Sequence, residues 1–392
     1  MNLKSEPIPF ALPSIGKEEE EAVLRVLRSG WLTTGAEARE FEKEFSSYVG
    51  SRHSLAVNSA TAGLHLCLEG LGVKKGDRVI TTPYTFTATA EVIRYLGADP
   101  LFVDIDPETF NLDPASVIRV LKCEKGVKGL LPVHIGGRPA AMEELIRIKE
   151  ERDIFLVEDA AHAFPLVYRD KFLGTWGDAG VYSFYATKTI TTGEGGMVAT
   201  DNSELARRIS TMRLHGIDRE IWDRYTSKEA SWMYRVVEAG YKYNMPDILA
   251  AIGREQLKKA EMFFRKRKKI AEFYQRTLGE LDFLHTPSSG GENAWHLYMV
   301  RLKTDKLSIG RDTFVKLLQA AGIGTSVHYI PLHIMPYYKD KYGYKPEDFP
   351  NTMKVFKSVF SLPIYPGMSE EQCVRVSDTV KNIGEAHYRG IH

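Results

Sequence analysis

The chain has 392 residues, of which 43% are hydrophobic and 26% are charged, as in ordinary globular proteins. Its 52 basic and 51 acidic residues give a net charge of +1, so electrostatics provides no reason to expect a nucleic acid or an anionic membrane as partner. Cys67, Cys123 and Cys373 lie far apart and lack the paired spacing of a metal site. We therefore expect no metal, free thiols in a reducing compartment and, because no signal peptide or membrane-length apolar run occurs, a cytoplasmic location.

Helical and strand patterns alternate through the first two thirds of the chain. The first helix is expected at residues 17–27, where Ala22, Val23, Val26 and Leu27 share one face. Strands are expected at 54–57, 78–81, 100–103, 129–134, 154–157, 179–183 and 196–200. Further helices are expected at 61–71, 88–96, 114–121, 142–152 and 203–214. This alternation favours a mainly parallel sheet with helices on both faces.

The pattern changes after residue 215. Residues 216–239 predict an irregular excursion whose Trp222, Tyr225 and Trp232 are expected to face a partner subunit. A long helix follows at 245–278, and its basic run at 265–269 is read as a solvated helix face because the total charge is near zero. A strand at 296–302 and helices at 311–321, 352–362 and 369–383 complete the chain. Since one core rarely serves so long a chain, we predict a large domain over 1–250 and a smaller C-terminal α/β domain over 251–392.

Two residues 29 positions apart, Asp159 and Lys188, carry the main chemical signal. Asp159 ends an apolar strand, where an unpaired carboxylate would be costly, and the separation leaves room for a short hairpin and one more strand. Both side chains can therefore reach the same edge of the sheet. A lysine delivered onto a ring whose nitrogen faces a buried carboxylate is what pyridoxal phosphate (PLP) chemistry requires. Taken alone, Asp159 could equally cap a helix or pair with an arginine, and most lysines are surface residues.

Other candidate residues also follow strands. Ala60 and Thr61 open a helix after a strand, as in an anion site at a helix N-terminus, although the same segment could be a simple N-cap. Phe86 could stack on a flat ring or be a core residue. His162 could reach the ring's phenolic oxygen, cover one ring face or be a core histidine, and Ser183 could place a hydroxyl on a phosphate. Their joint occurrence in this order favours a cofactor site.

On these residues the chain resembles the DegT/DnrJ/EryC1/StrS family of PLP-dependent aminotransferases that act on nucleotide-linked keto sugars. The matching stretches run from about residue 10 to 385 and comprise residues 29–35, 58–64, 158–162, 183–188, 193–197, 240–245 and 327–329. The resemblance implies the fold-type I architecture, with a mainly parallel seven-stranded sheet in the large domain and a smaller C-terminal α/β domain. It also implies a homodimer with shared active sites.

The resemblance also implies residue roles. Lys188 would bond the cofactor, Asp159 would hold the pyridine nitrogen and Phe86 would stack on the ring. The phosphate would be held by three residues, Ala60, Thr61 and Ser183. Lys242 would reach the partner's phosphate or substrate, and His328 and Thr33 would lie at the sugar. Two positions depart from the commonest family pattern, because many members carry glutamine in place of His162 and asparagine in place of Lys242.

The implied reaction moves the amino group of L-glutamate to a nucleotide-linked 3- or 4-keto sugar for surface polysaccharide or glycan biosynthesis. A sugar dehydratase on the same fold is the nearest alternative, and Lys188 argues against it because the best-known dehydratase variant carries histidine there. A cysteine desulfurase would need a reactive thiol on a mobile loop, a setting that none of the three cysteines occupies. A non-catalytic sensor would not need Lys188, Asp159 and Ser183 together.

Overall fold

In a computed structural model of the chain, residues 6–218, 233–287 and 291–389 are described. Their centre is a seven-stranded sheet in the order β1-β9-β8-β5-β4-β2-β3. The strands are β1 His53–Val57, β2 Arg78–Thr81, β3 Asp99–Phe102, β4 Val127–Leu130, β5 Phe155–Asp159, β8 Ala179–Ser183 and β9 Gly196–Thr200. Strand β9 is antiparallel to both of its neighbours, and the other pairs are parallel. The predicted mainly parallel α/β sheet is confirmed.

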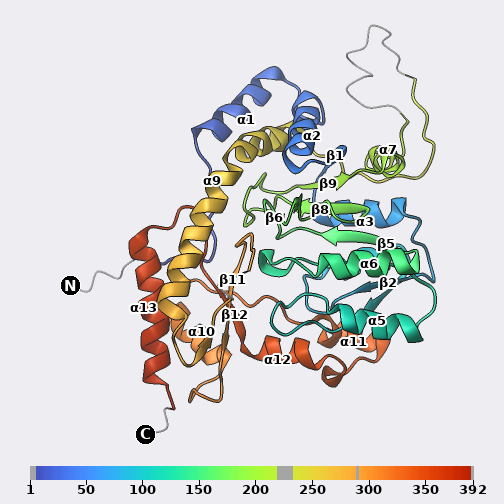
Figure 1. Ribbon diagram of the computed structural model, residues 1–392. Coiled ribbons are helices and arrows are strands. Elements are labelled where there is room, and N and C mark those ends of the chain that lie inside the picture. The colour runs from blue at the N-terminus through green and yellow to red at the C-terminus, as the bar shows by residue number, and fades with distance from the viewer. Residues whose placement is uncertain (1–5, 219–232, 288–290, 390–392) are drawn as a thin grey trace.

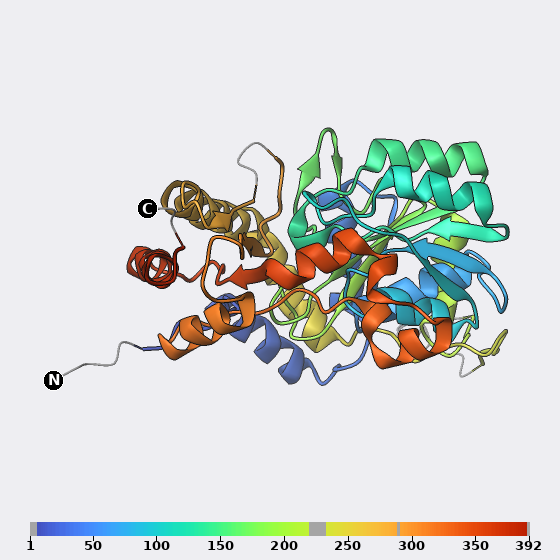
Figure 2. The same cartoon turned by 90° about the horizontal axis from the view of Figure 1, so that it is seen from below.

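Helices cover both faces of this sheet (Figure 2). One face carries α3 Ala60–Gly70, α4 Ala88–Tyr95 and α7 Ser203–Met212, and the other carries α5 Pro114–Cys123 and α6 Met142–Arg152. Successive strand residues enter opposite cores: Ile80 and Leu156 pack with the α6 side, whereas Val79 and Val157 pack with the α3 side. Because both faces are covered, strands such as β1, β8 and β9 are buried along nearly their whole length rather than at alternate residues.

The N-terminal helices α1 Lys17–Ser29 and α2 Ala36–Val49 pack on the first part of the long helix α9 Asp247–Leu278. Helix α2 was not predicted. Its N-terminus lacks a local side-chain cap, and instead Asp247 accepts hydrogen bonds from the backbone N–H groups of Gly35 at 2.7 Å and Ala38 at 3.1 Å. The cap thus comes from a residue more than 200 positions away. In α1, Ala22 and Val26 are buried as expected, but Leu27 is 50% exposed.

Helix α9 leads from the central sheet to a second, three-stranded antiparallel sheet (Figure 1). Its strands are β10 Leu284–His285, β11 Tyr298–Leu302 and β12 Val359–Leu362. The helices of this part are α10 Arg311–Ala320, α11 Pro336–Tyr342, α12 Pro350–Ser358 and α13 Glu370–Ala386. Between β5 and β8 lies the short hairpin of β6 Val167–Tyr168 and β7 Lys171–Phe172, and 3-10 turns occupy Ile135–Gly137, Leu332–Ile334 and Pro346–Asp348. The boundary predicted at residue 250 falls inside α9 and stays a prediction.

Three sequence-based expectations need correction. The helix predicted over 352–362 ends at Ser358, because residues 359–362 pair with β11 as a strand. The strand predicted over 129–134 ends at Leu130, after which only an isolated bridge joins Val133 to Asp159. The basic run in α9 is not uniformly solvated, since Arg267 is 2% exposed.

Two further expectations concern the aromatic residues of the excursion after residue 215 and the absence of a membrane-spanning segment. Trp222, Tyr225 and Trp232 lie outside the described residues. Within the described part of the chain, none of the helices combines the length and apolar character that crossing a bilayer requires.

Candidate active site

The Lys188 loop and the end of β5 meet at one edge of the central sheet. Strands β5 and β8 are parallel neighbours, with Asp159 opposite Val181, and the chain leaves β8 at Ser183 and reaches Lys188 through a turn closed by its backbone N–H on the Tyr185 carbonyl at 2.9 Å. The hairpin and the additional strand predicted between Asp159 and Lys188 are both present. A small cavity here is lined by Ala161, His162, Phe164, Ser183, Lys188, Thr189, Ile190 and His296.

Asp159 is 5% exposed and is held by two donors. The Thr89 hydroxyl donates to Oδ2 at 2.7 Å, and the Ala161 backbone N–H donates to Oδ1 at 3.2 Å. Burial raises the pKa of Asp159 despite these hydrogen bonds, because desolvation disfavours the charged carboxylate. A cation at this carboxylate would relieve that cost, which is what a protonated pyridine nitrogen supplies.

Lys188 has the properties of a nucleophile. Burial lowers the pKa of its amine from 10.5 to about 8, with the carboxylate of Asp159 acting in the opposite direction and the charge of Arg267 adding to the decrease. Near physiological pH a lysine with this pKa is neutral far more often than an ordinary lysine, and only the neutral amine attacks a carbonyl carbon.

His162 is a buried, neutral histidine with both ring nitrogens engaged. Its Nδ1 accepts from the Gly136 backbone N–H at 3.3 Å, and its Nε2 lies 3.0 Å from the Tyr329 hydroxyl. The ring packs against His296 at 4.4 Å between centroids. Burial, followed by the positive charge of Lys188, lowers the pKa of His162 well below its ordinary value. The structure thus places His162 in the Lys188 cavity rather than in a remote core.

The start of α3 presents backbone N–H groups that could bind an anion. Ser59 caps the helix by accepting from the Ala62 backbone N–H at 3.1 Å, whereas the N–H groups of Ala60 and Thr61 find no acceptor among the described residues. Gly196 is opposite Ser183 in the sheet register, and a Cβ at Gly196 would stand 2.7 Å from the Ala60 nitrogen. Ala60 and Ser183 therefore both lie next to Gly196, and the role of Ala60, Thr61 and Ser183 at a phosphate stays a prediction.

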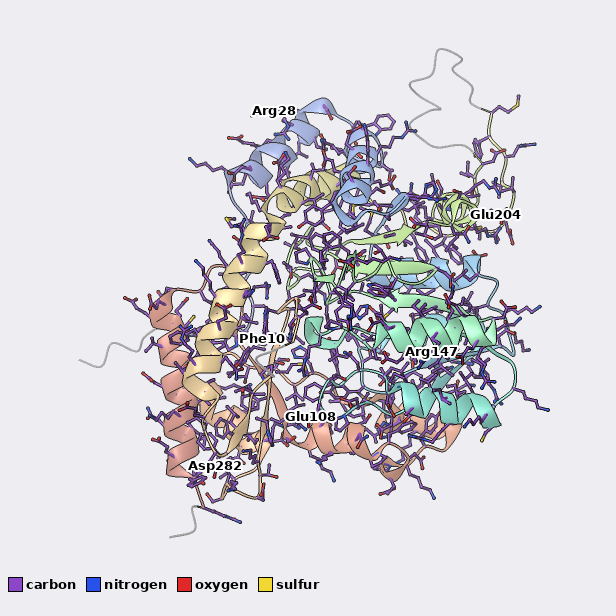
Figure 3. The ribbon with its side chains drawn as sticks, viewed as in Figure 1. Phe10, Arg28, Glu108, Arg147, Glu204 and Asp282 are labelled. Carbon is purple, nitrogen blue, oxygen red and sulfur yellow. The ribbon has the colours of Figure 1, made fainter. Side chains whose placement is uncertain are left out.

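Phe86 and His328 flank the cavity from two other segments. Phe86 is 59% exposed, and its ring lies 6.1 Å from that of Tyr329. His328 Nδ1 is 2.9 Å from the Ser361 hydroxyl, and its ring packs at 5.4 Å against Phe10, which lies between α9 and the central sheet (Figure 3). Burial and the charge of Lys188 lower the pKa of His328 to about 4. His328 is therefore neutral at physiological pH.

Lys242 and Thr33 form a separate group beside the end of β1. The Lys242 carbonyl accepts from the Asn58 side chain at 3.3 Å, and its Nζ donates to Asn244. The Thr33 carbonyl accepts from the Asp247 N–H at 3.2 Å. Both side chains are exposed, and within the described residues neither forms a hydrogen bond or ion pair with the Lys188 cluster.

Four residues of the site were not predicted as site residues. Thr89, His296, Tyr329 and Arg267 act through contacts between distant segments, which a single sequence does not reveal. Arg267 Nη1 donates to the carbonyls of Trp295, His296 and Ile364 at 3.3, 3.3 and 2.7 Å. It thereby ties α9 to the segment that carries His296. The sequence signal for the burial of Arg267 is its spacing in α9: it lies three residues before Ile270, on the same face of the helix, and Ile270 is buried.

The residues present fit PLP. Two unsatisfied N–H groups at a helix N-terminus suit a phosphate, and the buried carboxylate of Asp159 suits a pyridine nitrogen. The exposed face of Phe86 suits an aromatic ring, and the amine of Lys188, whose pKa is lowered by burial, suits an aldehyde.

A mainly parallel α/β sheet with this lysine and carboxylate at its edge defines a fold-type I PLP enzyme. The chain belongs to the DegT/DnrJ/EryC1/StrS aminotransferase family, whose model matches residues 13–381. It is 44% identical over 383 residues to the spore coat polysaccharide biosynthesis protein SpsC of Bacillus subtilis, covering 96% of this chain and 97% of SpsC.

Solved structures agree with this assignment. The putative sugar aminotransferase Spr1654 of Streptococcus pneumoniae, solved in PMP and PLP forms, is 30% identical; its PMP form covers 97% of this chain and 99% of its own with a TM-score of 0.90. DesI, solved in the presence of its TDP-sugar product, is 29% identical over 96% of this chain and 92% of its own, with a TM-score of 0.84. The expected family, cofactor and fold are confirmed.

Proposed function

We propose that the protein transfers the amino group of L-glutamate to a nucleotide-linked 3- or 4-keto sugar, for the biosynthesis of a surface polysaccharide or glycan. The observation that carries the proposal is the amine of Lys188, whose pKa is lowered by burial, near the buried carboxylate of Asp159 in a chain of this aminotransferase family. The likeness to DesI supports a nucleotide sugar as acceptor, and the likeness to SpsC supports polysaccharide biosynthesis.

The proposed roles of the cofactor-binding residues follow from their positions. PLP, when bound, withdraws electrons from the carbon that loses a proton. Asp159 sustains this effect by keeping the ring nitrogen protonated, and Thr89 and Ala161 orient its carboxylate. The phosphate is bound by the N–H groups of Ala60 and Thr61 and by the hydroxyl of Ser183, and Phe86 covers one face of the ring.

Lys188 moves the proton. With PLP held in this site, Lys188 Nζ would accept the proton from the α-carbon of the donor and donate it again within the same site, and the same amine would serve the sugar half-reaction in reverse. The pKa of about 8 lets this one amine act as base and as acid near neutral pH. We assign His162 to the phenolic edge of the ring and His328 to the sugar.

Lys242 and Thr33 are proposed to act across a homodimer interface. Both side chains are exposed, and within the described residues neither forms a hydrogen bond or ion pair with the Lys188 cluster of its own chain, which supports a role at the partner's phosphate or substrate. The assignment of Lys242 is tested by mixing the Lys188→Ala and Lys242→Ala proteins and measuring the aminotransferase activity of the mixture, with dimer formation checked by gel filtration. Shared sites predict that heterodimers regain one functional site and hence part of the activity, whereas no recovery would place both residues in one chain's site.

The proposed reaction is tested by its two halves. The holoprotein treated with L-glutamate is expected to release one equivalent of 2-oxoglutarate per site, and the product form is then offered a panel of UDP-, dTDP- and GDP-linked 3- and 4-keto sugars. Mass spectrometry should find one sugar nucleotide that has gained an amino group. Loss of a hydroxyl without gain of nitrogen would identify a dehydratase, and no reaction with any amino donor would exclude a transaminase.

A further inference from the structure

A chain of hydrogen bonds from Gly136 through His162 to Tyr329 fixes the direction in which each proton points. The Gly136 N–H can only donate, so His162 Nδ1 must be its acceptor at 3.3 Å. His162 is neutral, because burial and neighbouring positive charge lower its pKa well below the ordinary value. A neutral imidazole that accepts at Nδ1 carries its proton on Nε2.

The hydroxyl proton of Tyr329 has no hydrogen-bond acceptor in this arrangement of the described residues. His162 Nε2–H donates to the Tyr329 oxygen 3.0 Å away, so the phenol cannot return its own proton to that nitrogen. Among the described residues, the Tyr329 O–H then has no acceptor. Burial and the charge of Asp159 raise the pKa of Tyr329, which keeps the phenol protonated. A donor in a partly buried site without an acceptor is costly, so a bound group is expected to supply the oxygen.

The order of the strands indicates which oxygen this is. The start of α3 follows β1 and lies beside Gly196 of β9, Asp159 ends β5, and Gly136 follows β4 on the far side of β5. In PLP the phosphate arm and the phenolic oxygen lie on opposite sides of the axis joining the ring nitrogen to the aldehyde carbon. With the phosphate at α3 and the nitrogen at Asp159, the phenolic oxygen faces the β4 side, where His162 and Tyr329 lie.

We infer that the Tyr329 hydroxyl donates the hydrogen bond to the cofactor's phenolic oxygen and that His162 is a positioning residue acting through Tyr329. The ring of Tyr329 lies 6.1 Å from Phe86 and is nearly parallel to that of His162, at 15°. One of the sequence-based interpretations of His162, beside a cover over one ring face and a core histidine, made it the direct contact to this oxygen. Tyr329 is therefore an additional residue that touches the cofactor, and its donor stabilises negative charge on the oxygen beside the Lys188 nitrogen.

The predicted consequence is a shift in a cofactor titration. Without the Tyr329 donor, more negative charge stays on the phenolic oxygen. That charge holds the proton on the neighbouring Lys188 nitrogen more strongly, so this proton is lost at higher pH. Several titratable groups surround the pair and stay unchanged in a Tyr329→Phe variant: Asp159, Lys188, His134, His296, His328 and Tyr84.

The test is a pH titration of the visible absorbance of the holoprotein, without amino donor or sugar. Tyr329→Phe is expected to raise the midpoint by about one pH unit, a tenfold change in the proton equilibrium, and His162→Asn is expected to raise it less. The exposed Tyr337→Phe serves as matched control with no shift. A large shift in His162→Asn combined with none in Tyr329→Phe would overturn the inference by making His162 the direct contact.

A second measurement needs neither variant nor cofactor. Selective ¹⁵N-histidine labelling of the apoprotein reports the tautomer of His162, and the proton is expected on Nε2. A proton on Nδ1 would contradict the order of donors on which the inference rests. Because both measurements omit the sugar and glutamate, failure of the proposed transamination would leave them interpretable.

Discussion

The lowered pKa of Lys188 predicts how the apoprotein captures its cofactor as pH changes. At pH 8, an amine with a pKa of about 8 is half neutral, whereas one at the ordinary 10.5 is about 0.3% neutral. Lys188 should therefore present roughly 150-fold more reactive amine at that pH than a solvent-exposed lysine. Below pH 8 the capture rate should fall tenfold per unit, and above pH 8 it should level off.

The assay is stopped-flow absorbance of apoprotein mixed with PLP between pH 6 and 10. Asp159→Asn removes the negative charge that raises the pKa of Lys188, so the midpoint should move below 8. The exposed Asp170→Asn is the matched control and should leave it at about 8, and Lys188→Ala should abolish the signal. A midpoint near 10.5, or an upward shift in Asp159→Asn, would refute the view that burial makes Lys188 a nucleophile.

Three further substitutions probe the residues behind the site. Thr89→Val removes a 2.7 Å hydrogen bond to Asp159; since bonds to charged groups contribute about 1.5–3 kcal/mol, the dissociation constant of PLP should rise roughly 10- to 100-fold in an equilibrium titration. Gly196→Ala should weaken cofactor binding because its Cβ meets backbone at 2.7 Å, whereas Gly310→Ala meets nothing within 4 Å and should bind normally. Glu158→Gln puts an amide against backbone donors that the carboxylate satisfies, and urea unfolding should show a loss of about 3 kcal/mol.

The central sheet could be predicted from sequence because its signals are local. Most strands of the main sheet are short stretches rich in apolar residues, and the parallel pairing among β2, β3, β4 and β5 follows from the helices between them. The helix α2 was missed although Ala38, Phe41 and Phe45 have helical spacing, because its cap is supplied by Asp247. The segment 359–362 continues a helical pattern and becomes a strand only because β11 pairs with it.

The residues of the candidate site also fall into two groups: those with a local sequence signal and those brought in by contacts between distant segments. Lys188, Asp159 and Ser183 could be found because each follows a strand end, and parallel strands bring those ends together. Tyr329 and His296 come from segments whose approach depends on how the three-stranded part folds back onto the sheet. The burial of Arg267 within a basic run has only its helical spacing from Ile270 as a sequence signal, because the three backbone carbonyls that accept from its Nη1 come from other segments.

The central claim is that the amine of Lys188 forms the covalent bond to PLP. Borohydride reduction of the holoprotein, followed by digestion and mass spectrometry, tests it most directly. The account predicts a single reduced pyridoxyl adduct on the peptide that contains Lys188. An adduct on any other lysine, or a protein that binds PLP without forming one, would contradict it.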